Sequence, residues 1–254
     1  MYNLPRKKKG WMKLQVVKVV EEVEDTRTLF LEDYEDGGRV IDYIPGQYLT
    51  FRFDDLSERP IVRSYSLSSC PRETDYLTIT VKQVVDPVVS KYLCCEVKEG
   101  DVLTARGPIG RFVYESQKDT SHLVLVCAGS GITPFFSMLK EFEESLGSSD
   151  SPQEITLIAV FKTREDIIFR KKLEDLGKRQ RINITIALTR EDLRSEGYLY
   201  GRITGEMVEE VFKSDLGGKT YMVCGPGPMM ESIKAFLLSR GVGRDCIKEE
   251  SFDS

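Results

Sequence analysis

Six consecutive residues in the first third of the chain carry side chains that could bind a charged, aromatic ligand. The run Arg63-Ser64-Tyr65-Ser66-Leu67-Ser68 holds a cation, a phenol ring and three hydroxyls. In a strand, Arg63 and Tyr65 point to one face and Ser64 and Ser66 to the other. A guanidinium can hold a phosphate and a phenol ring can cover a flat heterocycle, as in a flavin site. An edge strand of mixed polarity is the alternative interpretation of these residues alone.

The composition is that of an ordinary globular protein, long enough for two domains. The 254 residues are 41% hydrophobic and 30% charged, and the net charge of -5 does not favour nucleic acid as a partner. No apolar run approaches the roughly 18 residues that span a bilayer, and the N-terminus lacks the apolar core of a signal peptide. The basic arm Pro5–Gly10 is interpreted as a solvated tail, with an acidic protein or a lipid surface as alternative contacts.

Cysteine and histidine usage argues against metal and triad chemistry. The six cysteines form no CxxC pair and no metal-ligand series, so no metal site is expected and a reduced, cytoplasmic setting is favoured. The single histidine, His122, begins an apolar run and is interpreted as a strand-end residue. No nucleophile-elbow motif accompanies it.

The first half of the chain has the pattern of a β domain, assigned to residues 1–115. Between Met12 and about Phe112, short runs rich in β-branched and aromatic residues alternate with turn clusters, which predicts a small antiparallel barrel or sandwich. Asp86 and Pro87 have the pattern of a helix start, whose free amides and nearby Ser90 hydroxyl would suit a pyrophosphate. A plain capped helix closing one end of the barrel is the alternative.

The second half, assigned to residues 116–254, alternates strands with helices. The continuous apolar run His122–Cys127 is typical of a strand buried on both faces. Further strands are expected at 155–161, 182–188, 220–224 and 247–252. The intervening helices are expected after Pro134, from the capping box Thr163–Asp166, near 205–212 and over 229–238. This order predicts a doubly wound parallel sheet.

Two glycine turns follow strands of this predicted sheet, where ligands of such sheets bind. They are Gly129-Ser-Gly131 after the first strand and Gly225-Pro226-Gly227 after the fourth. Either turn alone is weak evidence for a dinucleotide site, and the first turn lacks the third glycine of the usual dinucleotide fingerprint. Together they would let a dinucleotide backbone approach the sheet edge. Cys224 would end the fourth strand at the same edge, although most such cysteines are small core residues.

An antiparallel barrel with an Arg-x-Tyr-Ser strand, followed by a parallel domain with two glycine turns, resembles the ferredoxin–NADP reductase superfamily, which includes cytochrome b5 reductase and the reductase components of ring-hydroxylating oxygenases. The resemblance extends from about Gln15 to Phe252. Its motifs, in the family's order, are Pro45-Gly-Gln-Tyr48, Arg63-Ser-Tyr-Ser66, Leu77-Thr-Ile-Thr-Val-Lys82, Val89-Ser90-x-x-Leu93, Gly107-Pro-x-Gly-x-Phe112, Gly129-Ser-Gly-Ile-Thr-Pro134 and Cys224-Gly-Pro-Gly-Pro-Met229.

The resemblance implies FAD and NADPH or NADH as cofactors, and a role for each matching residue. Arg63 would bind a flavin phosphate, Tyr65 would lie against the isoalloxazine, and Ser66 would approach N5. Val81 and Lys82 would line the flavin, and Val89 with Ser90 would hold the FAD pyrophosphate. Thr133 would sit between flavin and nicotinamide, and Cys224 near nicotinamide C4. The pyridine-nucleotide cleft would be formed by Gly129, Gly131, Gly225 and Pro226, and Phe252 would cover the flavin.

Two departures from the family pattern affect these assignments. Pro87-Val88 stands where the family commonly has glycine, which leaves the pyrophosphate geometry and the choice of FAD over FMN open. Asp253-Ser254 follows Phe252, so the aromatic residue is not terminal. The implied reaction is hydride transfer from nicotinamide C4 to flavin N5. Ser66, Thr133 and Cys224 would tune it, without an acid–base triad.

The residues also bear on which nucleotide is used. NAD sites usually end the second strand with an acid for the ribose 2′-hydroxyl, but here Phe161 is followed by Lys162-Thr163-Arg164. Thr189-Arg190 is similar to the Ser-Arg pair that holds the 2′-phosphate in NADPH-using relatives, and Tyr200 to their adenine-stacking tyrosine. NADPH is therefore favoured over NADH. The alternative interpretation is that the charged side chains after these strands are solvated loop residues without a ligand.

No Cys-x4-Cys-x2-Cys run for a plant-type iron–sulfur cluster occurs, so electrons would leave to a separate carrier, a ferredoxin, flavodoxin or cytochrome. The alternatives are an NAD(P)H-dependent reductase of free flavin or quinone, and a non-catalytic electron-transfer subunit of a larger complex. The residues do not indicate an oligomeric state.

Overall fold

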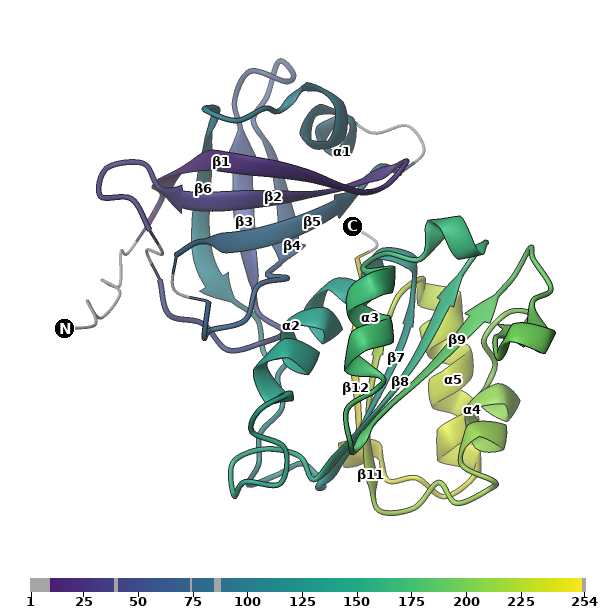
Figure 1. Ribbon diagram of the computed structural model, residues 1–254. Coiled ribbons are helices and arrows are strands. Elements are labelled where there is room, and N and C mark those ends of the chain that lie inside the picture. The colour runs from purple at the N-terminus through teal and green to yellow at the C-terminus, as the bar shows by residue number, and fades with distance from the viewer. Residues whose placement is uncertain (1–9, 39–40, 74, 85–87, 253–254) are drawn as a thin grey trace. The chain divides into compact units, whose positions relative to one another are not determined.

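The computed structural model describes residues 10–38, 41–73, 75–84 and 88–252, which form two compact units (Figure 1). The first unit comprises Met1–Val113 and Thr133–Glu141, and the second comprises Tyr114–Ile132 and Phe142–Ser254. Each unit is built on its own six-stranded sheet. Within the described residues no helix has the length and apolarity needed to cross a bilayer.

The first unit is the expected antiparallel β structure. Its strands pair in the order β4-β3-β6-β1-β2-β5, and a bridge from Leu67 to Ile79 connects the two end strands. The strand bounds are β1 (Met12–Val23), β2 (Thr26–Asp33), β3 (Tyr48–Phe53), β4 (Ile61–Ser66), β5 (Leu77–Lys82) and β6 (Val102–Ile109). Alternation builds the core: in β5, Leu77, Ile79 and Val81 join the buried cluster.

Two helical segments belong to this unit. The short helix α1 (Val89–Lys91) continues into a π-helical turn, Tyr92–Glu96, and both follow β5. The Asp86–Pro87 helix start expected from the sequence lies outside the described residues. Helix α2 (Ile132–Phe142) follows the first glycine turn, as predicted, and the Ser137 hydroxyl donates to the Ser69 carbonyl at 2.5 Å. Lys140 pairs with Glu73 at 2.6 Å, so α2 is attached to the segment after β4.

The second unit is the expected doubly wound parallel sheet, in the order β10-β9-β8-β7-β11-β12. Its strands are β7 (His122–Ala128), β8 (Glu154–Phe161), β9 (Ile182–Leu188), β10 (Leu199–Tyr200), β11 (Lys219–Cys224) and β12 (Ile247–Glu250). The helices α3 (Arg170–Leu176), α4 (Gly205–Val211) and α5 (Gly227–Ser239) connect them. The alternate residues Val124 and Val126 of β7 pack in one core cluster with Val208 of α4 and Ile233 of α5.

The second glycine turn leads into α5 as predicted, with Pro226 as the N-cap residue and Pro228 in the first turn. The capping box at Thr163 is present, because the Thr163 and Asp166 side chains and backbone amides bond reciprocally. It opens a 3-10 turn (Arg164–Asp166) rather than the α-helix, which begins at Arg170. The two-residue strand β10 gave no period-2 pattern in the sequence.

Candidate functional site

Strand β4 presents Arg63 and Tyr65 differently, although they lie on one face. Register pairing sets Tyr65 opposite Leu49 and Arg63 opposite the buried Phe51. The Tyr65 ring packs on the barrel core, with its centroid 6.0 Å from that of Phe51, and burial raises the pKa of its phenol. Arg63 is exposed, and its guanidinium donates only to the Val62 carbonyl, at 2.9 Å, among the described residues. The strand therefore offers a fixed ring and an uncompensated cation.

Ser66 ends the strand with a hydroxyl that lacks a partner. Its side chain is 4% exposed, and its Oγ has no hydrogen bond among the residues that the structure describes. Ser64, on the same face, bonds instead to Thr50 at 3.1 Å. Burying a hydroxyl unpaired costs about 1–3 kcal/mol. A ligand nitrogen or oxygen beside Ser66 would remove that cost.

The two expected flavin-lining residues of β5 have other roles as well. The Val81 side chain is buried in the barrel core, and its carbonyl oxygen accepts from the Cys94 thiol at 3.3 Å. Lys82 binds both carboxylate oxygens of Asp25, at 2.5 and 2.6 Å. Asp25 was not singled out from the sequence, because it lies 57 residues from Lys82. The charge of Lys82 is thus largely neutralised within the protein.

Val89 and Ser90, expected at the pyrophosphate, are both buried at the start of α1. The Ser90 Oγ accepts a hydrogen bond from the Val84 amide at 3.3 Å. This bond ties the helix start to the end of β5. Thr133 lies in the first turn of α2 and is 2% exposed. It belongs to the same unit as β4.

In the second unit, the two glycine turns meet at the carboxyl edge of neighbouring strands. Strands β7 and β11 pair in parallel, with Cys127 opposite Cys224. A Cβ added to Gly131 would lie 2.8 Å from the Cys224 carbonyl carbon and closer still to its oxygen. A Cβ on Gly225 (φ +156°) would lie 3.3 Å from the Ala128 amide nitrogen. The turns must therefore be glycine, because the backbones themselves are in contact.

Cys224 and Glu250 end neighbouring strands at this edge. They face each other in the β11–β12 register, and the Cys224 side chain is fully buried. Burial and the carboxyl group of Glu250 raise the pKa of the Cys224 thiol, so this thiol is protonated at neutral pH. The Glu250 Oε2 is buried without a hydrogen bond among the described residues, and desolvation raises its pKa to about 7. Glu250 was not predicted from the sequence as a site residue, because only strand register brings it to Cys224.

The ends of β8 and β9 carry the residues expected at the nucleotide's adenosine end. The Arg190 amide donates to the Lys162 carbonyl at 2.8 Å, and both side chains are exposed without a carboxylate partner among the described residues. Other arginines nearby are neutralised: Arg164 pairs with Glu196, and Arg194 with Asp192. The exposed Tyr200 ring lies 5.9 Å from the Arg194 guanidinium. The Thr189 amide bonds to the Phe161 carbonyl at 3.0 Å.

The remaining expected residues also lie where the strands end. Gly129 has a φ of +55° and no atom within 4 Å of an added Cβ, so it supplies conformation rather than space. Pro226 precedes the first turn of α5. Phe252 follows β12 and is 39% exposed. The orphan Ser66 hydroxyl and the closely packed glycine turns fit a flavin and a dinucleotide, respectively.

Comparisons with known proteins agree with this architecture. Residues 13–114 match the oxidoreductase FAD-binding domain family, and residues 125–235 match the oxidoreductase NAD-binding domain family. The chain is 30% identical to the NADH oxidoreductase HCR of Escherichia coli over 252 residues, covering 98% of this chain and 70% of that protein. It is 32% identical over 246 residues to the ferredoxin reductase component of a 3-ketosteroid-9-alpha-monooxygenase from Mycolicibacterium smegmatis, covering 96% of this chain and 66% of that one.

Among solved structures, the flavohem-like FAD/NAD-binding domain of a Vibrio cholerae nitric oxide dioxygenase superposes with a TM-score of 0.82 at 25% identity, covering 96% of this chain and 99% of that domain. A Neisseria gonorrhoeae ferredoxin NADP+ reductase with bound FAD and NADP shares the fold, with a TM-score of 0.80 at 20% identity, covering 96% of this chain and all of that one. The chain belongs to the ferredoxin–NADP reductase superfamily. It is an FAD-dependent NAD(P)H oxidoreductase.

Proposed function

We propose that this chain takes a hydride from NADPH, or less readily from NADH, and delivers electrons to a separate carrier protein. One observation supports it most strongly: within four residues, β4 provides the unpaired guanidinium of Arg63, the packed ring of Tyr65 and the orphan hydroxyl of Ser66. FAD, when bound, accepts a hydride from the nicotinamide and passes its electrons on singly or in pairs.

The residues of the first unit would hold the flavin by complementary means. Arg63 supplies a cation for a phosphate, and Tyr65 supplies a flat surface whose position is set by its contact with Phe51. Ser66 would donate to or accept from the reactive edge of the ring. Val89 and Ser90, at the buried start of α1, would receive the pyrophosphate, and Thr133 would meet the nicotinamide.

The residues of the second unit would hold the nucleotide mainly through backbone. Gly129, Gly131, Gly225 and Pro226 would form the close-packed backbone turns that the nucleotide approaches at the strand ends, with Cys224 as a protonated neighbour of the nicotinamide. Phe252 would cover the flavin when no nucleotide is present. Positioning, rather than proton transfer by a triad, would be this protein's contribution to the rate.

Lys162 and Arg190 support a preference for NADPH. Both are uncompensated cations linked through the backbone at adjacent strand ends, whereas Arg164 and Arg194 already bind carboxylates. A 2′-phosphate would be the charge that balances them. The Escherichia coli relative is named an NADH oxidoreductase, so the relatives' names do not decide the preference.

The acceptor is proposed to be a separate protein because relatives are themselves components of larger systems. One is named the ferredoxin reductase component of a monooxygenase, and another the reductase subunit of a glycine betaine monooxygenase from Pseudomonas aeruginosa. The chain spans about two thirds of the length of these relatives. An exposed flavin edge that reduces free flavin or quinone without a partner would be the competing outcome.

An absorption spectrum of the purified protein, before and after addition of NADPH or NADH, tests the proposal. A yellow protein whose flavin band bleaches is expected, with faster bleaching by NADPH. A colourless protein that cannot be reconstituted with FAD would contradict it. For the preference, Arg190→Ala is expected to lower the ratio of kcat/KM for NADPH over NADH about tenfold or more. Arg194→Ala, at an arginine that already pairs with Asp192, serves as the control. An unchanged ratio in Arg190→Ala would contradict the assignment of Arg190 to the 2′-phosphate.

A further inference from the structure

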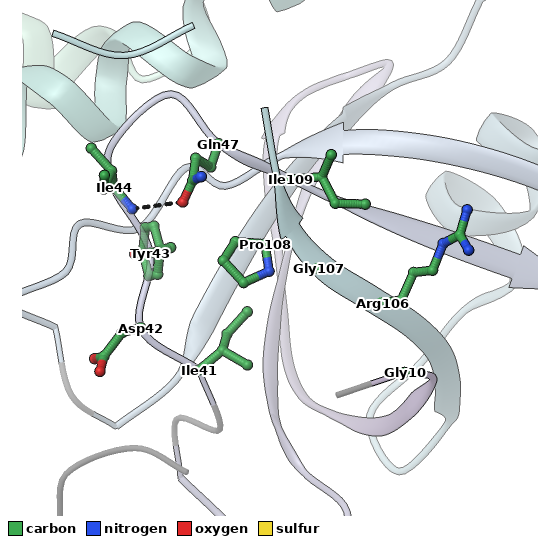
Figure 2. Close-up of a pocket in the computed structure, with 10 residues that line it drawn as sticks. All are labelled: Gly10, Ile41, Asp42, Tyr43, Ile44, Gln47, Arg106, Gly107, Pro108 and Ile109. Carbon is green, nitrogen blue, oxygen red and sulfur yellow. Dashed lines mark hydrogen bonds between the residues drawn. The ribbon is translucent and has the colours of Figure 1, made fainter. Parts of the chain in front are cut away.

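A cavity of about 730 Å³ opens on the first unit, and none of the residues assigned to FAD or to the nucleotide lines it (Figure 2). It lies between the segment 41–47, which precedes β3, and the end of β6. Two sequence motifs that have no assigned cofactor contact border it, Pro45–Tyr48 and Gly107–Phe112. Its size is within the range of protein ligand pockets, roughly 300–1,000 Å³. The cavity is therefore large enough to hold a ligand of its own.

One side of the cavity is a β-bulge in β6. Between Arg106 and Ile109 this strand has two residues, Gly107 and Pro108, where β3 has only Leu49. Gly107 has a φ of +147°, and a Cβ there would lie 2.8 Å from the Leu49 side chain. Pro108 has no amide hydrogen, so it adds no unpaired donor to the lining. Bulges of this kind bend a strand, re-aim its side chains and are frequent next to functional sites.

Apolar side chains from the two segments face each other across the cavity. Figure 2 shows Pro108 pointing toward Ile41 and Tyr43, and the latter two belong to the buried core cluster of the barrel. The Tyr43 hydroxyl donates to the Ser69 Oγ at 2.7 Å, so the phenol already has a partner and its ring presents an apolar surface. A ligand that matches this wall has an apolar body.

The Gln47 side chain holds the two sides of the cavity together before anything binds. Its oxygen accepts from the Ile44 amide at 2.9 Å, and its nitrogen donates to the Gly110 carbonyl at 3.2 Å. One side chain therefore connects the 41–47 segment to the segment that follows β6. A preformed pocket binds a ligand at a smaller entropic cost than one that must first be ordered.

Arg106 brings a cation to the same cavity. Its guanidinium lies 4.9 Å from the Trp11 ring centroid, and it forms no ion pair within the described part of the chain. Stacking on a ring covers one face of a guanidinium and leaves its in-plane N–H groups, which bind a carboxylate through two parallel hydrogen bonds. Because residue 107 is glycine, no side chain stands between this cation and Pro108.

Asp42 is the acidic residue of the described lining, and it lies away from the cation. Figure 2 shows Asp42 and Arg106 on opposite sides of Pro108. Asp42 also has an interaction of its own. An anionic group at the Arg106 side therefore gains the cation without meeting the carboxylate of Asp42.

We propose that this cavity binds a compact apolar carboxylate, either a medium-chain fatty acid or an aromatic acid. The apolar body would lie against Ile41, Tyr43 and Pro108, and the carboxylate would bind Arg106. The assignment goes beyond the proposed function and does not depend on it, because the lining shares no residue with the flavin and nucleotide sites.

Calorimetry on the full-length, flavin-loaded protein tests the site with two acids and their alcohols. Octanoate and 1-octanol carry an acyl chain, and 2-naphthoate and 2-naphthalenemethanol carry an aromatic ring. At least one acid is expected to bind with a Kd of about 1 mM or tighter, and about tenfold or more tighter than its alcohol. Whichever acid binds identifies the acyl or the aromatic class. Binding of neither acid would overturn the assignment, and so would equal affinity for an acid and its alcohol.

Arg106→Gln should remove the advantage of the carboxylate. We expect the Kd of the acid to rise about tenfold or more while the Kd of its alcohol stays within about twofold. Arg52→Gln is the matched control, because Arg52 is an exposed arginine of the neighbouring strand β3 that already pairs with Asp54. This control should leave both Kd values within about twofold. Equal weakening of the acid by the two variants would overturn the assignment to Arg106.

Trp11 reports whether the acid binds at this cavity. It is the single tryptophan of the chain and its ring stacks with Arg106. Binding of the acid should change its fluorescence, corrected for absorbance by the probe, in wild type and not in Arg106→Gln. Saturating NADP+ should leave the Kd of the acid within about twofold. Binding without a change in fluorescence, or competition by NADP+, would place the acid elsewhere and overturn the proposal.

This site and the proposed function fail in distinguishable ways. A protein that cannot be loaded with FAD, but binds the acid through Arg106, would overturn the proposed function and leave the cavity assignment standing. A yellow protein that NAD(P)H bleaches, but that binds neither acid, would do the reverse.

Discussion

The end of β4 and the carboxyl edge of the second sheet are prepared for ligands in opposite ways. At β4 the protein supplies side chains: an exposed guanidinium on Arg63, a packed ring on Tyr65 and an unpaired hydroxyl on Ser66. At the carboxyl edge it omits them, because Gly131 and Gly225 allow neighbouring backbones to touch. Removing a side chain should therefore damage the first region, whereas adding one should damage the second.

The largest effect is expected from Gly131→Ala. The new Cβ would overlap the Cys224 carbonyl, so β7 and β11 must separate at the edge where the nucleotide would bind. A displacement of about 1 Å at such a site can cost about 100-fold, and a loss of that size in kcat/KM for NADPH is expected. The nucleotide Kd, measured by difference absorbance, should rise in parallel, while the flavin band is retained.

Gly129→Ala is the matched control, two residues away in the same turn. Its Cβ meets no atom within 4 Å, and only the φ of +55° disfavours it, by about 1–2 kcal/mol. The protein should lose some stability but keep most of its nucleotide affinity. Equal loss of affinity in both variants would show that backbone contact at Gly131 is not the feature that matters.

The second effect tests the side-chain region. Arg63→Ala should weaken FAD binding by about 10–100-fold, the range expected for one charge-assisted contact. FAD content after dialysis and the Kd from apoprotein titration measure it. The fold itself should be unaffected, since Arg63 is exposed and bonds only to its neighbour's carbonyl. Arg63→Lys should recover part of the affinity, and full FAD retention in Arg63→Ala would count against the assigned role.

The antiparallel unit and the parallel α/β unit could both be predicted from the sequence, because each follows from the spacing of its hydrophobic residues. The continuous apolar run of β7 indicates a strand buried on both faces, and the alternation of apolar residues in β5 places Leu77, Ile79 and Val81 together in the barrel core. The boundaries of helices were harder: the capping box at Thr163 marks a 3-10 turn, and the α-helix begins seven residues later, at Arg170. A cap signals where a turn starts, but packing decides how far the helix continues.

Candidate site residues could be proposed from the sequence where they are neighbours along the chain, and not where only the fold brings them together. Arg63, Tyr65 and Ser66 lie on one strand, and the glycine turns are contiguous motifs. The Asp25–Lys82 ion pair and the Cys224–Glu250 pair join residues that only strand register brings together. The burial that raises the pKa of Glu250 also depends on tertiary packing, and so has no signature in the sequence.

The third effect concerns Glu250 and belongs to the carboxyl edge. Burial raises the pKa of its carboxyl from an ordinary value near 4.5 to about 7, so the folded protein binds a proton there that the unfolded chain releases between those values. Stability is therefore lost as pH rises from about 4.5 to about 7, by roughly 1–3 kcal/mol. Glu250→Gln should remove this loss.

Denaturant midpoints of wild type and Glu250→Gln measure the difference. At pH 8, without nucleotide, the variant should be the more stable protein, and near pH 4.5 the two should coincide. The exposed Glu165→Gln, in the same unit, serves as the control and should show no pH-dependent gain. Parallel curves for wild type and Glu250→Gln would show that the carboxyl of Glu250 titrates normally.

The smallest effect on stability, and the sharpest comparison of the two regions, comes from Ser66→Ala. In flavin-free protein the buried Oγ has no partner, so removing it relieves the cost of burying it, while the small gap left by alanine offsets part of that gain; a net stabilisation of less than about 1 kcal/mol is expected. With FAD bound the sign should reverse, because the hydroxyl then gains a partner and its removal costs about 1 kcal/mol of binding. Paired titrations of apoprotein and FAD-loaded protein with urea measure both signs.

Thr50→Val, which breaks the satisfied Thr50–Ser64 bond, should instead destabilise both forms equally. If Ser66→Ala were to behave like Thr50→Val, the orphan hydroxyl would be a structural group, and β4 would lose its clearest mark of a ligand.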